Sequence, residues 1–166
     1  MLETRRLSLR NFLAEDAEVL FEYRNDIRCN LYQRYDATDK EHLQRFVSDF
    51  SRCSFLSMEE EQHYAIILTE SGEMIGDVSI FFSKDDNCFT LGITISPLYQ
   101  RKGYAFEILR EVIARMRGRY PSVDIVALID KENTKSVGLF EKLGFSLECY
   151  AGSIRSYVFT IYGQRC

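Results

Sequence analysis

The chain has 166 residues, of which 46% are hydrophobic and 28% charged, with only two prolines and nine glycines. This composition is that of one ordinary folded domain, and it excludes collagen-like, low-complexity and disulfide-scaffold proteins. No apolar run approaches the ~18 residues that cross a bilayer, and Met1 to Arg6 lack the apolar stretch of a signal peptide. We therefore expect a single domain over residues 1–166, cytoplasmic in location and without a membrane partner.

The charged residues and cysteines narrow the class of partner. The 21 basic and 25 acidic side chains give a net charge of −4, which argues against nucleic acid because phosphate binding needs clustered cations. The five cysteines form no C-x-x-C pair, and only His42 and His63 could join them as imidazole ligands. Structural zinc ligands normally come in close pairs, so we expect reduced thiols and no metal.

The first 60 residues predict one strand and two helices. Leu7 and Leu9 alternate with polar residues, which is typical of a short strand. Two apolar sets at helical spacing follow: Leu13, Ala17, Leu20 and Phe21, then Leu43, Phe46, Val47 and Phe50. Asp39 is expected to cap the second helix, and residues 27–35 between the two show no clear period.

From residue 62 the apolar period changes to two, which predicts a series of strands. Alternation runs over residues 64–68, 75–82 and 89–95, with a turn at Ser71-Gly72 between the first two. Pro97 is expected to end the third strand because proline cannot donate a hydrogen bond to a sheet.

The last third predicts helices that alternate with strands. A long helix begins near Lys102 and is expected to stop at Gly118 and Pro121. Residues 123–129 follow as a strand that is apolar on both faces apart from Asp124, which predicts a central strand covered on both sides.

A second helix is predicted over Asn133 to Leu143, ended by Gly144 as a C′ glycine. Residues 145–150 and 154–162 read as two closing strands. The last of these is predicted to be an exposed edge strand, through which the chain could form a homodimer. The element order is β-α-α-β-β-β-α-β-α-β-β, a mixed sheet with helices against its faces.

The loop from Tyr99 to Ala105 joins the strand that ends at Ser96 to the long helix. A glycine-containing loop before a helix presents unbonded N–H groups and the positive end of the helix dipole to an anion. Arg101 and Lys102 add positive charge, and neither the P-loop nor the dinucleotide fingerprint occurs in the chain. The loop predicts a phosphate site, or alternatively an ordinary helix start with an exposed basic pair.

The sequence of this loop resembles that of a known family. Residues 100–105 read QRKGYA and fit every fixed position of the pyrophosphate loop of the GNAT superfamily of acyl-CoA-dependent N-acetyltransferases, [QR]-x-x-G-x-[GA]. A second family block matches downstream, at Asn133–Ser136 and Leu139–Phe145. The chain therefore resembles this superfamily, and Glu3–Leu7 with Arg24–Asp26 is most similar to the branch of ribosomal-protein N-terminal acetyltransferases.

The resemblance implies a fold and a reaction. The fold is of the α/β (α+β) class: a mixed, largely antiparallel sheet of about seven strands, splayed between strands 4 and 5 and flanked by about four helices. The reaction takes acetyl-CoA as co-substrate and transfers the acetyl group directly to a primary amine, at a protein N-terminus or on a small molecule, through a ternary complex. The alternative is a non-catalytic acyl-CoA-binding or ribosome-associated module.

The resemblance also implies the cofactor-binding residues. The loop would hold the CoA pyrophosphate by its main-chain N–H groups, and it comprises Gln100, Arg101, Lys102, Gly103, Tyr104 and Ala105. The main chain at the end of the preceding strand, at Thr94, Ile95 and Ser96, would bind the pantetheine arm. Asn133 would combine a helix N-cap with a cofactor contact.

The resemblance does not settle which group donates a proton to the departing thiolate. Many family members protonate the departing thiolate with a tyrosine, but the matching position here is Phe140. Ser136 or water would then donate, although Ser136 also fits an ordinary place in the first turn of a helix.

The base that accepts the amine proton also remains open. Asp77 interrupts an apolar strand and could point into the acceptor cleft or to solvent. His63 is a weaker candidate, residues 59–61 could attract a cationic amine or simply be solvated, and water could serve in place of any of them.

Overall fold

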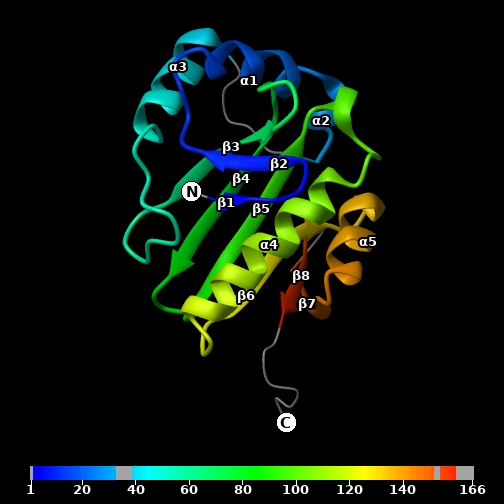
Figure 1. Cartoon of the computed structure of the whole chain (residues 1–166). Coiled ribbons are helices and arrows are strands. Elements are labelled where there is room, and N and C mark those ends of the chain that lie inside the picture. Colours follow the sequence, from blue (N-terminus) through cyan, green and yellow to red (C-terminus); the bar gives the residue numbers. More distant parts are fainter. Residues whose placement is uncertain (1, 33–38, 152–153, 160–166) are drawn as a thin grey trace.

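The computed structural model describes residues 2–32, 39–151 and 154–159, which form one sheet with helices on both of its faces (Figure 1). The strands are β1 (Leu2–Glu3), β2 (Leu7–Arg10), β3 (Gln62–Leu68), β4 (Met74–Ser83), β5 (Cys88–Ile95), β6 (Asp124–Asp130), β7 (Ser146–Ala151) and β8 (Ile154–Phe159). The helices are α1 (Asp16–Arg24), α2 (Ile27–Asn30), α3 (Lys40–Asp49), α4 (Tyr104–Arg119) and α5 (Thr134–Lys142), with a 3-10 turn η1 (Pro97–Tyr99).

The sheet order is β1-β2-β3-β4-β5-β6-β8-β7, and all neighbours are antiparallel except the parallel pair β5 and β6. The mixed, largely antiparallel sheet confirms the predicted fold class. Among the described residues it has eight strands rather than about seven and five α-helices rather than about four. The short elements β1 and α2, of two and four residues, carry too little periodicity to be found from sequence.

Alternation along the central strands divides the apolar residues between two cores. On β3, Tyr64 and Ile66 belong to the core that contains the apolar residues of α4, whereas Ala65 and Ile67 belong to the core with α1 and α3. Figure 1 shows α4 across one face of the sheet, away from α1 and α3. The sheet is therefore a central layer, and its strands β3 and β4 are buried on both sides over most of their length.

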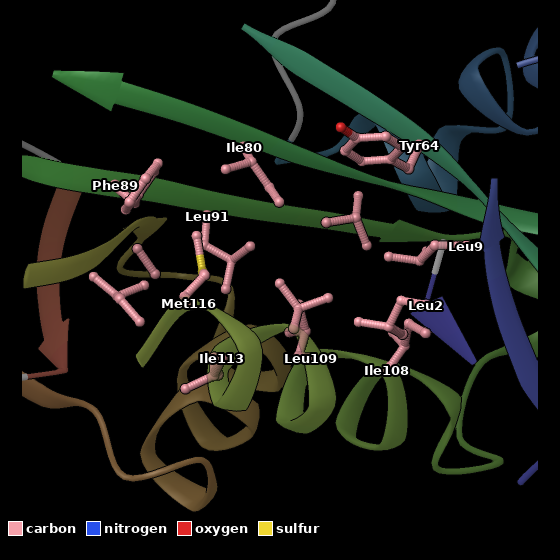
Figure 2. Packing of buried hydrophobic residues seen from close by; sticks show 14 of the residues in the cluster. Leu2, Leu9, Tyr64, Ile80, Phe89, Leu91, Ile108, Leu109, Ile113 and Met116 are labelled. Atoms are coloured by element: carbon pink, nitrogen blue, oxygen red, sulfur yellow. The ribbon is translucent and has the colours of Figure 1, made fainter. Parts of the chain in front are cut away.

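Helix α4 packs through one apolar stripe. Ile108, Leu109, Ile113 and Met116 are buried and point toward the sheet residues drawn in Figure 2. The helix begins at Tyr104, two residues later than predicted, and runs through Gly118 to Arg119. A glycine in an exposed last turn costs only about 1 kcal/mol relative to alanine, so it does not end the helix.

Two predictions about the late strands are wrong. Ile125, Ala127 and Ile129 of β6 are buried, but Leu128 on the opposite face is 60% exposed, so this strand is not covered on both sides. Strand β8 lies between β6 and β7, so it is not an edge strand. Within the described part of the chain, β8 has a neighbour on each side, and the homodimer expected through residues 154–162 loses its basis; residues 160–162 lie outside the described part.

The amino-terminal predictions hold with one exception. Asp39 caps α3 by accepting a hydrogen bond from the amide of His42, as expected. Leu13, predicted to join the apolar stripe of α1, precedes the helix and is 46% exposed. In the residues that the structure describes, no helix is both long and apolar enough to cross a membrane.

Candidate functional site

The site begins where β5 and β6 separate. These parallel strands are in register only from Cys88 opposite Asp124 to Thr90 opposite Val126, after which they diverge. The predicted splay between the family's fourth and fifth strands is this one, shifted by one label because β1 precedes them. The remainder of β5 therefore has β4 as a partner on one side and an opening on the other.

The direction of the β5 main chain follows from one hydrogen bond. The Ser96 amide donates to the carbonyl oxygen of Ile75 at 2.8 Å, so the main chain of Ser96 turns toward β4. A Cβ atom added at Gly76 would meet the Thr94 carbonyl oxygen at 2.1 Å, which places that group beside β4 as well. Since main-chain groups alternate along a strand, those of Ile93 and Ile95 face the opening.

The loop that follows has an unusual backbone. Arg101 and Gly103 both have positive φ angles, +63° and +80°, and Gly103 is the N-cap of α4. Successive N–H groups in such turns point to one side and form a concave anion site. Gly103 has no side chain to cap the helix, so the N–H groups of the first turn and the helix dipole are directed at whatever occupies that concavity.

Two side chains fix the shape of this loop. Gln100 donates from Nε2 to the Ile95 carbonyl oxygen at 2.9 Å, which ties the loop to the end of β5. Arg6 donates from Nη1 to the Lys102 carbonyl oxygen at 3.1 Å and pairs with Glu107 on α4 at 2.7 Å. Gln100, at the first fixed position of the motif, therefore holds the loop against the end of β5, and Arg6 of the amino-terminal segment holds it against α4.

A cavity of about 330 Å³ lies between the loop, the opening in the sheet and α5. Of the predicted cofactor residues, nine line it: Thr94, Ile95, Gln100, Arg101, Gly103, Tyr104, Ala105, Asn133 and Ser136. Ser96 and Lys102 are not among the described residues that line it. Its cations include Arg101, Lys135 and also Arg28, which the sequence reasoning missed because α2 was not foreseen.

Helix α5 places two polar side chains beside this cavity. The Asn133 side chain accepts a hydrogen bond from the Ser136 amide at 3.2 Å, so the predicted N-cap role of Asn133 is confirmed. Ser136 is half-buried in the first turn. Phe140, one turn further on, is buried and packs edge-on against Phe145 with ring centroids 5.0 Å apart.

A second cavity, of about 200 Å³, adjoins the first. Five residues line both of them: Tyr32, Ile93, Thr94, Asn133 and Ser136. The second cavity is walled on its far side by Arg24, His63, Asp77 and Ser79, and in the middle by apolar residues of β5 and β6. The two cavities therefore meet at the opening between β5 and β6.

Asp77 on β4 lies in the wall of this second cavity and is only 5% exposed, so it does not face solvent. The Tyr23 hydroxyl donates a hydrogen bond to Oδ1, and an Arg24 nitrogen lies 3.6 Å from Oδ2. Burial raises the pKa of Asp77, but His63, Arg24 and Tyr23 outweigh it and hold the pKa below its ordinary 3.8. Asp77 is therefore an anion that is already paired, which makes it a weak proton acceptor.

His63 stands between two carboxylates. Its Nε2 is 3.0 Å from Glu61 Oε1, and its Nδ1 is 4.0 Å from Asp77 Oδ2. The ring packs against Phe46 of α3 and against Phe50, the C-cap of that helix, with centroids 4.8 and 4.4 Å away. Burial lowers the pKa of His63, but the carboxylates of Asp77 and Glu61 more than offset this and raise the pKa above its ordinary 6.5.

The described thiols lie outside any nucleophilic arrangement. Cys29, Cys53 and Cys88 are free, and burial raises the pKa of each. The pKa of Cys29, which lines the larger cavity, is about 11, so its thiolate is scarce at neutral pH. Among the described residues, no group of three or more His, Cys, Asp or Glu side chains could hold a metal ion.

Several site residues were not singled out as such from sequence. Tyr23 and Arg24 stand on the last turn of α1. Arg24 was noted from sequence only within Arg24–Asp26, a segment of the family resemblance, and Tyr23 had no signal there. His63 and Asp77 were separate candidates from sequence, and the strand register is what brings them together: Ala65 pairs with Asp77 and His63 with Ser79, so the two side chains are diagonal neighbours on one face.

Comparisons with known proteins agree with this geometry. The family model described as "Acetyltransferase (GNAT) domain" matches residues 6–146. The N-acetyltransferase p20 of Bacillus licheniformis is 27% identical over 162 residues, covering 94% of this chain and 86% of p20.

Solved structures show the same fold. A GNAT-family acetyltransferase from Bacillus anthracis superposes with a TM-score of 0.83 at 22% identity, covering 96% of this chain and 98% of that one. A ribosomal L7/L12 α-N-protein acetyltransferase in complex with coenzyme A superposes with a TM-score of 0.76 at 16% identity, covering 94% of each chain. With the family model matched over most of its length, the chain belongs to the GNAT acetyltransferase family and is an acetyl-CoA-dependent N-acetyltransferase.

Proposed function

We propose that the protein transfers the acetyl group of acetyl-CoA directly to a primary amine, at a peptide N-terminus or on a small molecule, in a ternary complex. The observation that carries the proposal is the pair of adjoining cavities, which share five lining residues at the opening between β5 and β6. One cavity is bordered by the anion-binding loop, and the other by buried polar side chains. Two substrates can thus enter from different sides and meet at one point.

The larger cavity fits coenzyme A in chemistry as well as in place. The N–H groups from Arg101 to Ala105 would hold the pyrophosphate, with Arg28 and Lys135 nearby for the remaining phosphate charge. The main chain of Ile93 and Ile95 would bind the pantetheine amides as an added strand would. When bound, acetyl-CoA supplies an acetyl group activated as a thioester.

This assignment refines the sequence expectation for the pantetheine arm. The Ser96 amide already bonds to Ile75, and the Thr94 carbonyl lies beside Gly76. We therefore place the main-chain contacts at Ile93 and at the amide of Ile95, whose carbonyl oxygen already accepts from Gln100, while Thr94 would act through its side chain in the wall that both cavities share.

Ser136 is our proposed donor to the departing thiolate. It lines both cavities at the point where they meet, and its hydroxyl can donate a hydrogen bond. Phe140 lies on the same helix face one turn later but cannot donate. Asn133 would hold the first turn of α5 so that Ser136 keeps this position.

Asp77 enters the proposal as a fixed negative charge. Its pairing with Arg24 and Tyr23 keeps it ionised inside the wall of the acceptor cavity. A buried carboxylate of this kind stabilises positive charge that forms beside it. The acceptor nitrogen becomes more positive as it attacks the thioester, and Asp77 is placed to stabilise that charge.

The acceptor is a proposal on chemical grounds. The acceptor cavity is small and contains carboxylate and imidazole groups beside an apolar floor, which suits a single compact amine rather than a large aromatic substrate. One structural neighbour is named as an acetyltransferase of the α-amine of a ribosomal protein. Short peptides with free N-termini are therefore the first acceptors to test.

The test is direct. Purified protein is mixed with acetyl-CoA and a panel of peptides and small amines, and acetylated products are identified by mass spectrometry. Release of free thiol gives the rate, with a no-acceptor control because the chain itself has five cysteines. Acetylation of at least one primary amine is the expected result. Binding of acetyl-CoA without turnover of any amine would instead favour the non-catalytic module.

A further inference from the structure

The second cavity contains an imidazole whose surroundings fix which nitrogen can accept a proton. His63 is the second residue of β3, on the face that looks toward α3, and it lines the acceptor cavity. The other histidine of the chain, His42, lies near the start of α3 and lines neither cavity. His63 is thus the only histidine in the proposed site among the described residues.

Glu61 sets the tautomer of the neutral ring. Its pKa is held below the ordinary 4.5, with the hydrogen bond to His63 as the largest cause, so the carboxylate is ionised at neutral pH. An ionised carboxylate can only accept. At a separation of 3.0 Å, Nε2 of His63 must therefore carry the hydrogen and donate it to Glu61.

The other ring nitrogen is left with its lone pair. Nδ1 is buried and has no hydrogen-bond partner among the described residues. It lies on the side of the ring toward Asp77, which is also in the cavity wall, and the 4.0 Å separation is too long for a direct hydrogen bond. Nδ1 is therefore the ring nitrogen that can accept a proton, and Asp77 beside it would stabilise the protonated ring.

We infer that His63 is the general base of the proposed acetyl transfer, taking a proton from the acceptor amine at Nδ1 and releasing it to solvent past Glu61. The acceptor arrives as an ammonium ion, and Nδ1 removes one proton to free the nitrogen lone pair. The nitrogen–carbon bond then forms and the carbon–sulfur bond breaks. The nitrogen then gives its second proton to water, and the leaving sulfur gains a proton either directly from water or from Ser136, which regains one from solvent.

The charges around His63 are consistent with this role. Glu61 faces it from the residues before β3, Asp77 from β4, and Arg24 reaches it from α1 through its pairing with Asp77. Helix α3 contributes the rings of Phe46 and Phe50, and Cys53 follows that helix with a thiol whose pKa burial raises. Glu61 is 54% exposed at its side chain, so the Nε2 end of the ring leads to solvent.

The inference rests on the proposed acetyl transfer and is tested by comparing a kinetic pKa with a spectroscopic one. With one peptide acceptor, kcat/KM is measured from pH 5 to 9, and the His63 ring is titrated by NMR in the same buffer. Because the chain has only two histidines, His42→Gln assigns the signals and should leave activity unchanged. We expect kcat/KM to decline as the pH is lowered, and this acidic limb of the profile should have an apparent pKa equal to that of the His63 ring.

Two variants sharpen the comparison. His63→Gln should lower kcat/KM at pH 7.5 about a hundredfold and abolish the acidic limb. Glu61→Gln should lower the pKa of His63 and move the acidic limb to lower pH by the same amount. A limb that reported the pKa of the free acceptor amine would not move, because that pKa does not depend on the enzyme. Glu70→Gln, in the exposed turn just after β3, is the matched control and should change neither the pKa of His63 nor the acidic limb.

The outcomes separate cleanly. A folded His63→Gln protein that keeps kcat/KM within threefold and retains the limb would overturn the inference. If that variant does not fold, a Glu61→Gln protein whose NMR pKa moves while its kinetic limb stays in place would overturn it equally. A wild-type protein that acetylates no amine would refute the proposed function itself, and the inference would fall with it.

Discussion

The two halves of the site are built in different ways. The half that we propose binds the cofactor, the cofactor half, is a main-chain structure: an opened strand, a loop with two positive φ angles and a helix N-terminus. The acceptor half is a side-chain structure, in which α1, β3 and β4 bring a tyrosine, an arginine, a histidine and an aspartate together.

This difference explains how each half responds to substitution. Main-chain groups are present at every residue, so the cofactor half tolerates side-chain changes except where backbone geometry demands glycine. Side chains of the acceptor half depend on one another for charge and hydrogen bonds, so one change leaves a buried partner unpaired. We therefore expect substitutions in the acceptor half to affect folding and those in the cofactor half to affect affinity.

The largest effect is expected at Asp77. Asp77→Ala removes the carboxylate that pairs with the buried Arg24 and accepts from Tyr23, and breaking a buried pair costs about 3–5 kcal/mol. Urea unfolding should show a loss of this size. Asp86→Ala, in an exposed turn, is the control and should lose under about 1 kcal/mol. A loss at Asp77 no larger than the control would contradict the side-chain account of this half.

Ser136 tests the point where the halves meet. Ser136→Ala should lower kcat roughly 100-fold if this hydroxyl protonates the thiolate, with acetyl-CoA affinity and melting temperature nearly unchanged. Steady-state kinetics and calorimetry on the same preparation measure the two quantities. An unchanged kcat would assign the proton to water.

Gly103 tests the main-chain half. Gly103→Val forces a β-branched residue into φ near +80°, which costs about 1–3 kcal/mol and should weaken acetyl-CoA binding at least tenfold. Calorimetric titration measures the change. Gly118→Ala in the last turn of α4 meets no atom within 4 Å, and is the control expected to keep affinity. Equal affinity in both variants would remove the loop from the site.

The smallest effect is a pH dependence of stability. Asp77 has a lowered pKa, so its contribution is full above the unfolded value near 3.8 and is lost as pH falls through the folded pKa. His63 has a raised pKa, so its contribution is full below 6.5 and is lost as pH rises through the folded pKa. The melting temperature should therefore fall on both sides of a maximum between these values, and His63→Gln should remove the alkaline decline.

The cofactor half could be predicted from sequence because its geometry is local. Gly103 and the residues around it lie on one continuous segment between a strand and a helix, so the sequence indicated a possible phosphate loop there and the family resemblance assigned it to CoA. Even there, the sequence could not show that the Ser96 amide turns toward β4, because that depends on pairing with Ile75. It also could not show that Gln100 braces the loop.

The acceptor half was largely hidden because it is non-local. Asp77 looked like a strand residue of either face until α1 and α3 were seen to cover that side of β4. The position of β8 between β6 and β7 was hidden for the same reason, since alternation does not tell which strands are neighbours. Leu128 is exposed because it lies on the face of β6 opposite the α4 core, and the core formed by α1 and α3 includes no described residue of β6, a feature without any local signal.

One measurement tests the division of the site most directly: titration of isotope-labelled protein with acetyl-CoA, followed by amide chemical shifts. The account predicts the largest changes at the amides of Ile93, Ile95 and residues 101–105, with smaller ones at His63 and Asp77. Absence of binding, or changes that leave the loop and β5 unaffected, would contradict it.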